Sequence, residues 1–268
     1  MIVVGKLSAW RLLRLETNDA FTNMAVDEAV MTARIAGLVP STLRFYKWKP
    51  SAVSVGRFQD VFKEVDVENC RRHGVDIVRR ITGGGAVYHD HDGEITYSVI
   101  VNEKELGFVD VVSAYNMICN GLIEAAKVLG IRADFHPGDP KQCPNITIGG
   151  RKISGSAQHH RRGVLLQHGT FLMDIDLEKM FTFLRVPWAK TLMDVLKVAQ
   201  ERLTSVKQEL GYSISMEDAH QALVRGFERA LNTSLIEGEL TDYEWHLAEK
   251  LREEKFATDD WNLQGKHL

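Results

Sequence analysis

The stretch RRITGGGAVYHDHDGEITYSV, residues 79–99, places three consecutive glycines between two arginines and a run that is typical of a β-hairpin. Glycine leaves the backbone bare, so residues 83–85 can approach a ligand closely, and consecutive exposed amides form a concave anion site. Because side chains alternate along a strand, only one of Arg79 and Arg80 can point toward the glycine side. The stretch predicts a nest for phosphate or carboxylate, with a glycine-rich bend and solvated arginines as the equal alternative.

Composition and charge limit the class of protein. The chain has 268 residues, 44% of them hydrophobic and 26% charged, which is typical of a soluble globular protein. The net charge of −3 argues against a general nucleic-acid binder, so any basic site must be local. No stretch approaches the roughly 20 apolar residues of a membrane span, and the cysteines lack metal-ligand spacing. We therefore expect a cytoplasmic protein that binds neither nucleic acid nor membrane.

Short runs rich in β-branched and aromatic residues alternate along the chain with runs of helical periodicity. We expect long helices at 18–36 and 109–129, and further helices beyond Asp174. Strands are expected at 10–16, 43–48, 52–58, 75–80, 86–89, 94–101, 145–149, 151–157 and 164–175, with 43–58 forming one hairpin and 86–101 another. A boundary near Gly211 divides an α+β body, residues 1–211, from a small helical segment of the same domain, residues 212–268.

Two further segments carry chemically useful side chains. GGRKISGSAQ, residues 149–158, places Lys152 among small residues, where its ammonium can reach a phosphate or an acyl carbonyl oxygen. LLQHGTFLMD, residues 165–174, places His168 between apolar runs. A surface lysine on a strand and a hydrogen-bonded core histidine are the ordinary alternatives.

Two histidine-containing clusters are interpreted as structural. His89 and His91 flank Asp90, but no third metal ligand follows at a recognisable spacing, which favours a polar hairpin turn. Residues 159–162, with the sequence HHRR, predict a solvated basic turn in preference to a landing patch for an acidic carrier domain.

In their order and spacing, the segments RRITGGGAVYHD, GGRKISGSAQ and LLQHGTFLMDID resemble the signature segments of the lipoate–protein ligase A family and its related octanoyl and lipoyl transferases. The resemblance extends through LRFYKWKPSAVSVGRFQ and EEKFATDDWN, so it covers nearly the whole chain. It implies the fold of biotin ligases, a mixed sheet flanked by helices with an apolar acyl tunnel. It also implies a lipoyl carrier domain as partner, of the 2-oxoacid dehydrogenase E2 or the glycine cleavage H type.

The same resemblance assigns roles to individual residues. Lys152 is expected to be the central catalytic contact, against the carboxylate and the α-phosphate of the acyl-adenylate. The remaining binding residues are expected around that adenylate, with His168 behind them: Arg80, Gly83, Gly84, Gly85, Ala86, Val87, Tyr88, Gly155, Ser156 and Ala157.

The family contains two chemistries, and the residues point both ways. Ligases activate lipoate or octanoate with ATP, and Gly85 favours them because the transferases typically carry an arginine that would fill the nucleotide space. Transferases form a thioester on a cysteine in the loop before the GRK segment, where Cys143 lies, although closer to that segment than in those transferases. Ligases often have an aspartate that helps to hold Mg²⁺ where this chain has Asn145, a poorer ligand.

We expect an ATP- and Mg²⁺-dependent lipoate–protein ligase, with a Cys143-dependent octanoyl or lipoyl transferase as the alternative. A non-enzymatic acyl-carrier-binding protein is the third hypothesis, which the combination of Arg80, the three glycines and Lys152 argues against. Because only LQGKHL follows Asn262, we expect no further C-terminal domain, and a separate accessory protein is left open.

Overall fold

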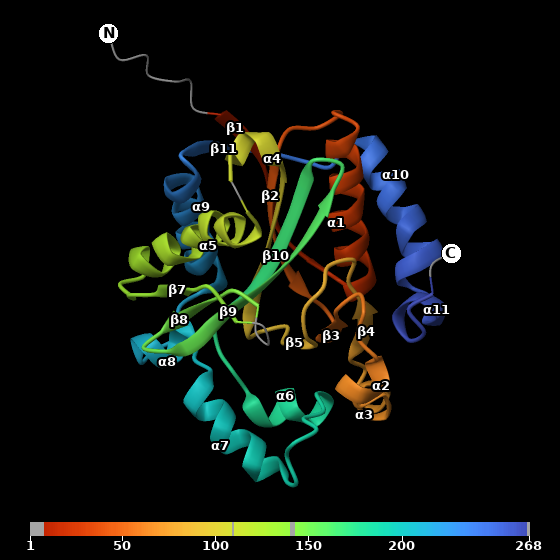
Figure 1. Ribbon diagram of the computed structural model, residues 1–268, viewed down its shortest axis with the longest axis vertical. Coiled ribbons are helices and arrows are strands. Elements are labelled where there is room, and N and C mark those ends of the chain that lie inside the picture. Colours follow the sequence, from red (N-terminus) through yellow and green to blue (C-terminus); the bar gives the residue numbers. More distant parts are fainter. Residues whose placement is uncertain (1–7, 109, 140–142, 267–268) are drawn as a thin grey trace.

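A computed structural model describes residues 8–108, 110–139 and 143–266, and has a mixed α+β architecture with helices on both faces of a large sheet (Figure 1). Within these residues the large sheet has eight strands in the order β11-β1-β2-β6-β10-β9-β8-β7. Its strands are β1 (Ser8–Asn18), β2 (Thr42–Trp48), β6 (Glu94–Asn102), β7 (Asp134–His136), β8 (Asn145–Ile148), β9 (Arg151–Arg161), β10 (Val164–Leu172) and β11 (Thr233–Gly238). A second described sheet, in the order β4-β3-β5, consists of β3 (Ala52–Val55), β4 (Asp76–Arg79) and β5 (Val87–His89).

Alternation along the central strands explains the three layers of the fold. Leu12 and Phe45 belong to the core between the sheet and the helices α5 and α9, whereas Leu13 and Tyr46 belong to the core under α1 and α10. The described helices are α1 (Ala20–Ile35), α2 (Val61–Glu64), α3 (Val67–Arg72), α4 (Glu103–Leu106), α5 (Val111–Val128), α6 (Leu177–Phe183), α7 (Leu192–Arg202), α8 (Val206–Leu210), α9 (Met216–Leu231), α10 (Asp242–Leu251) and α11 (Asp259–Asn262), with a π-helical turn η1 (Arg252–Phe256).

Both predicted hairpins are wrong, although their strands exist. Strand β2 is paired on one edge with β1 and on the other with β6, so it has no free edge for β3. Strand β3 instead pairs with β4 and β5 in the small sheet. The turn at residues 90–93 is therefore a crossover from β5 in the small sheet to β6 in the large one. This crossover sets the glycine loop, between β4 and β5, beside the large sheet.

The segment after Gly211 packs onto the body of the fold. Helix α9 lies against α5, and β11 extends the large sheet as a parallel neighbour of β1 (Figure 1). The sequence predicted only helices here, so β11 was missed, and the boundary near Gly211 stays a prediction. No helix of the described residues is both long and apolar enough to span a membrane.

Helices α5 and α9 approach each other through glycine. A Cβ on Gly226 would lie 2.4 Å from the carbonyl oxygen of Gly121, and one on Gly121 would lie 2.5 Å from the ring of Phe227. Such contacts force the backbones apart.

We predict that Gly226→Ala lowers the free energy of unfolding by about 1–3 kcal/mol, because overpacking outweighs the better helix propensity of alanine. Urea denaturation measures the change. The neighbouring exposed Arg225→Ala serves as the control and should stay within about 0.5 kcal/mol of the wild type. A Gly226→Ala protein as stable as the wild type would contradict the close approach of α5 and α9.

Candidate functional site

A cavity of ≈ 240 Å³ opens where the glycine loop of the small sheet meets β9 and β10 of the large sheet. It collects most of the residues that the sequence singled out. Those residues are Arg80, Gly84, Gly85, Ala86, Val87, Cys143, Lys152, Gly155, Ser156, Ala157 and His168. Its apolar wall includes Met24, Tyr46 and Trp48. Two basic side chains and a thiol thus face a partly apolar space, and a few polar groups in an apolar cavity are typical of a small-molecule site.

Three of the predicted site residues do not line this cavity. Gly83 lines a neighbouring groove. The ring of Tyr88 stacks on Phe183 in the core of the small sheet, with 5.2 Å between ring centroids. Asn145 is buried beside the loop, and its Nδ2 donates a hydrogen bond to the carbonyl oxygen of Cys143 at 3.1 Å. Asn145 therefore positions the backbone that carries the thiol.

The guanidinium of Arg80 donates hydrogen bonds to the glycine loop and to the residues around it. Its Nε donates to Thr82 Oγ1 at 3.2 Å, and its Nη1 donates to the carbonyl oxygen and Oγ of Ser54 at 3.0 and 2.7 Å. Its Nη2 donates to the carbonyl oxygens of Gly83 and Gly85 at 2.9 and 3.0 Å. These five bonds use all five donors of the guanidinium. Arg80 therefore shapes the loop, and no N–H remains for a phosphate in this arrangement.

The charge of Arg80 lacks a direct counter-ion. It forms no ion pair with any carboxylate in the described part of the chain. Burial lowers the pKa of Arg80 to about 10, and the charge of Cys143 is among the opposing effects. The guanidinium is still protonated at neutral pH, so it contributes a positive potential to the cavity.

Arg79 points the other way, as strand alternation predicts. Its Nε donates to the carbonyl oxygen of Trp261 at 2.9 Å and its Nη2 to that of Asn262 at 3.1 Å. Its own carbonyl oxygen accepts a bond from Trp261 Nε1 at 2.8 Å. Arg79 thus fastens the C-terminal DDWN segment to the strand that precedes the glycine loop.

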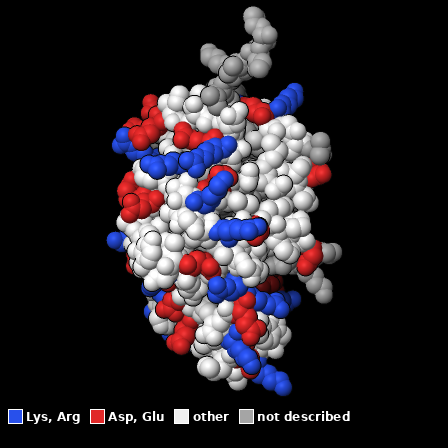
Figure 2. All heavy atoms as spheres, turned by 90° about the vertical axis from the view of Figure 1, so that its left-hand side faces the viewer, with Lys and Arg blue, Asp and Glu red and all other residues white. Residues whose placement is uncertain are grey.

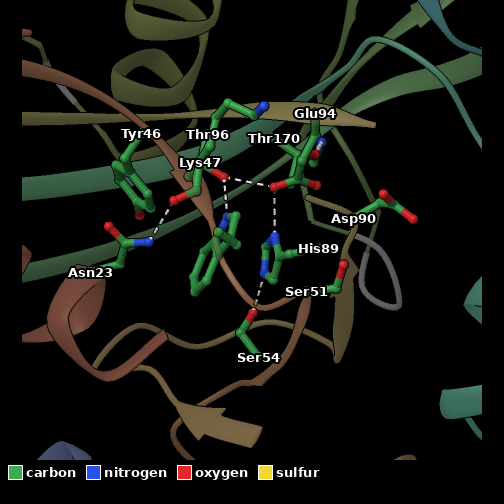
Figure 3. Close-up of polar contacts among 12 residues, drawn as sticks. Asn23, Tyr46, Lys47, Ser51, Ser54, His89, Asp90, Glu94, Thr96 and Thr170 are labelled. Carbon is green, nitrogen blue, oxygen red and sulfur yellow. Dashed lines mark hydrogen bonds and ion pairs between the residues drawn. The ribbon is translucent and has the colours of Figure 1, made fainter. Parts of the chain in front are cut away.

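His89 was interpreted from the sequence as part of a polar turn, and this was wrong. It ends β5, is buried, and stacks on the ring of Trp48 with centroids 4.1 Å apart. Its Nδ1 lies 2.7 Å from Glu94 Oε1, and its Nε2 lies 2.7 Å from Ser54 Oγ (Figure 3). Since a carboxylate only accepts, Nδ1 carries the proton and Nε2 accepts from Ser54, whose oxygen accepts from Arg80. A buried relay therefore joins Glu94 to the glycine loop.

His168 is held on two sides in the wall of the cavity. Its Nε2 lies 2.8 Å from Thr82 Oγ1 and its Nδ1 lies 2.9 Å from Asp27 Oδ2. Asp27 also accepts from Arg44 Nη1 at 3.0 Å and from the Tyr46 hydroxyl at 3.1 Å. Burial lowers the pKa of His168 against the opposing effect of Asp27. The imidazole is thus a fixed, neutral hydrogen-bonding group at neutral pH.

Cys143 and Lys152 share the cavity. The thiol of Cys143 is free and exposed at the rim. The Lys152 ammonium lies over Gly155, where an added Cβ would be 2.7 Å from Nζ, so a larger residue at position 155 would displace the end of the lysine side chain. Burial lowers the pKa of Lys152, and the charge of Cys143 opposes that shift. Lys152 has no side-chain hydrogen bond or ion pair among the described residues, so its ammonium is available to a ligand.

A metal site is not formed by the described residues, since no group of three or more histidine, cysteine or acidic side chains is placed to hold an ion. The Asn145 amide, the expected weak Mg²⁺ ligand, is engaged instead with the backbone of Cys143. Its Oδ1 is buried without a hydrogen-bond partner in the described residues.

Residues 19–228 match the model of the lipoyl protein ligase A/B catalytic domain. The chain belongs to this family. This confirms the resemblance that the sequence motifs predicted. The family match covers the small sheet, the large sheet except β1 and β11, and every residue of the cavity described above.

Proteins similar to this chain include some named octanoyltransferase and some named lipoate–protein ligase. It is 39% identical to octanoyltransferase LipM of Kyrpidia tusciae, with 96% of this chain and 100% of that protein covered. It is 32% identical to octanoyltransferase LipM of Bacillus subtilis, over 95% of this chain and 98% of that one. A lipoate–protein ligase A bound with ATP is similar in structure, with a TM-score of 0.83, 30% identity and coverage of 96% and 100%. The predicted biotin/lipoate ligase type of fold is therefore confirmed.

We predict that the stability of this family member decreases as the pH falls below about 6.5. Burial lowers the pKa of His159, His168 and His220, so below pH 6.5 the unfolded chain binds more protons than the folded one. The contribution is fully present above the unfolded pKa and is lost as the pH falls toward the folded values. Thermal denaturation between pH 7.5 and 5 tests this. His168→Gln should reduce the pH dependence, and an unchanged dependence in that variant would contradict the buried neutral state.

Proposed function

We propose that this protein is an octanoyltransferase, which carries the acyl group as a thioester on Cys143 and passes it to a lysine of a lipoyl carrier domain. The observation that carries the proposal is that an exposed free thiol lies in the same cavity as Lys152. The Lys152 ammonium, the expected catalytic cation, has no hydrogen bond to the other described residues. Relatives at 32–39% identity that carry the name octanoyltransferase support it.

The residues of the cavity suit both half-reactions. In the first, the Cys143 thiolate attacks the carbonyl carbon of an acyl thioester, and the donor thiolate leaves and takes up a proton. In the second, the neutral amine of the carrier lysine attacks the Cys143 thioester, an amide forms, the amine gives up a proton, and the Cys143 thiolate returns. The Lys152 ammonium offsets the oxyanion of both tetrahedral intermediates. The atoms balance without ATP, an oxidant or a reductant.

The structure gives less support to the ligase that the sequence favoured. The donors of Arg80, expected to hold the charge of an adenylate, are all engaged with protein oxygens. The expected Mg²⁺ ligand Asn145 is a neutral amide bonded to the loop. A non-enzymatic carrier-binding protein would need neither the free thiol nor the free ammonium.

An ATP-dependent ligase is the second candidate, because a structural relative is described as bound with ATP. Gly85 is exposed, and a Cβ there would meet nothing within 4 Å, which leaves space beside the loop for a nucleotide. Only in that case are ATP and Mg²⁺ cofactors.

The proposal that a lipoyl carrier domain is the partner is also supported by a relative. The bipartite lipoate–protein ligase of Thermoplasma acidophilum, described together with its E2 lipoyl domain, aligns with a TM-score of 0.83 and 30% identity over 97% of this chain and 98% of that one. We assign the reaction to the cytoplasm, where thiols such as that of Cys143 stay reduced.

Cys143→Ser tests the proposed function, because a serine hydroxyl is not ionised at neutral pH and does not replace the thiolate. Incubated with octanoyl-coenzyme A and no ATP, the wild type should gain one octanoyl group in intact-mass spectrometry. Cys143→Ser should gain none and lose carrier modification.

The control is Cys70→Ala, since Cys70 is buried in the core of the small sheet away from the cavity, and it should keep the adduct. Carrier modification that requires ATP and lipoate, and that persists in Cys143→Ser, would establish the ligase instead.

Lys152→Ala should lower the rate of acyl transfer by about 10²-fold or more, because it removes a charge that stabilises the tetrahedral intermediates. Single-turnover transfer from octanoyl-coenzyme A measures the loss, and the melting temperature checks the fold. Lys127→Ala, an exposed position on α5, is the matched control and should keep the wild-type rate. A folded Lys152→Ala protein with near wild-type turnover would remove Lys152 from the mechanism.

A further inference from the structure

A second groove, of ≈ 570 Å³, runs beside the acyl cavity on the side of α1. The glycine loop and β9 form the partition between the two. Gly83 and Gln158 line the groove, whereas the next residue of the loop, Gly84, and the preceding residue of β9, Ala157, line the acyl cavity. A protein bound in this groove would therefore be separated from the catalytic cavity only by the glycine loop and β9.

The groove is locally basic. Its charged lining residues in the described structure are Arg57, Arg161, Lys255 and the single carboxylate Glu28, with histidines counted as neutral. Lys255 pairs with Glu28 at 2.6 Å, while Arg57 and Arg161 have no ion pair within the described residues. Three cations against one carboxylate leave the groove positive in a chain whose net charge is −3.

The opposite side of the molecule has a different distribution of charge. The face formed by α5 and α9, on the left in Figure 1 and turned toward the viewer in Figure 2, carries basic and acidic side chains interspersed. A positive groove next to the catalytic cavity is therefore a local feature, of the kind that selects an acidic partner.

An aromatic side chain stands at the same groove. Phe58 is 90% exposed, and its ring lies 5.8 Å from the guanidinium carbon of Arg57. The same guanidinium lies 4.5 Å above the ring of Trp261, which helps to fix its position. Aromatic side chains and arginines are enriched in protein interfaces, and burial of an exposed phenylalanine under a partner makes the free energy of binding more favourable.

The acyl cavity itself explains why docking energy is needed. The carrier lysine arrives as an ammonium, and the cavity already holds the uncompensated charges of Arg80 and Lys152. Like charge repels the ammonium and lowers its pKa, which favours the neutral amine that attacks the thioester. The free energy for bringing it there has to come from contacts away from the reacting atoms.

We propose that this basic groove, with Phe58 at its edge, docks the acidic face of the acceptor domain whose lysine takes the acyl group from Cys143. The proposal rests on the proposed octanoyltransferase function and adds the surface by which the acceptor is recognised. Arg57 and Arg161 attract acidic side chains of the acceptor, and Phe58 is covered by its apolar surface.

Two adjacent arginines provide a matched pair of variants. Arg161 lines the groove, whereas Arg162, which is also exposed, follows it in the β9–β10 turn and does not line the groove. Enzyme acylated on Cys143 by octanoyl-coenzyme A is mixed with the acceptor domain, and the loss of the acyl group is followed by intact mass under single-turnover conditions. The acylation step itself reports on the proposed function, and the second step reports on docking.

We expect Arg161→Glu to slow transfer to the acceptor domain by about tenfold or more at low salt, through weaker association, and to flatten its dependence on salt. Phe58→Ala should weaken the same step, and Arg162→Glu should leave it unchanged. Failure of the wild type to form the acyl-enzyme would refute the proposed function.

Normal acylation with no loss of transfer in Arg161→Glu would refute the docking surface alone. Equal losses in Arg161→Glu and Arg162→Glu would also refute it, because they indicate a general field effect. If Arg161→Glu impairs only acylation by a carrier-bound octanoyl donor, the groove belongs to the donor and the proposal is overturned.

Discussion

The hydrogen bonds from the buried guanidinium of Arg80 to the glycine loop are the constraint on which the site depends. The carbonyl oxygens of Gly83 and Gly85 turn inward to meet them, and Gly84 between them has a φ of +90°, a conformation that other residues rarely adopt. The loop also lies so close to β3 that a Cβ on Gly56 would be 2.1 Å from the carbonyl oxygen of Gly84. Losing any one acceptor would leave a buried charged donor unpaired, at about 1–3 kcal/mol or more.

The relay from Arg80 through Ser54 and His89 to Glu94 extends this constraint across the two sheets. Glu94 belongs to β6 of the large sheet, whereas His89 and Ser54 belong to β5 and β3 of the small one. The Glu94 carboxylate is linked to the Arg80 guanidinium only through His89 and Ser54, so it does not neutralise the guanidinium directly and the cavity keeps a positive potential. A direct ion pair would have neutralised that potential. The relay thus couples the packing of the sheets to the charge of the site.

The sequence predicted local secondary structure better than it predicted which strands pair with each other. The strands, the long helices and the opposite orientations of Arg79 and Arg80 follow from periodicity, which is a property of neighbouring residues. The two hairpins failed because pairing depends on which edges other strands already occupy, and β2 is flanked by β1 and β6. Strand β11 was missed because TSLIEG is short and lies between two helices. His89 was missed because its partners, Ser54 and Glu94, meet only when β5 and β6 enter different sheets.

Sequence motifs alone do not distinguish a ligase from a transferase in this chain. As single positions, Gly85 favours a ligase and Asn145 disfavours one, but their roles depend on their contacts. The donors of Arg80 are used within the protein, one of them on the carbonyl oxygen of Gly85, and Asn145 holds the backbone of Cys143. A cavity with the uncompensated cations of Arg80 and Lys152 stabilises any developing anion in it, a thiolate and an oxyanion alike. Such a field suits the proposed thioester exchange, because both of its half-reactions pass through an anionic tetrahedral intermediate at the same carbonyl. The same field opposes entry of a protonated lysine, so in the proposed transfer the acceptor needs a binding surface outside the cavity.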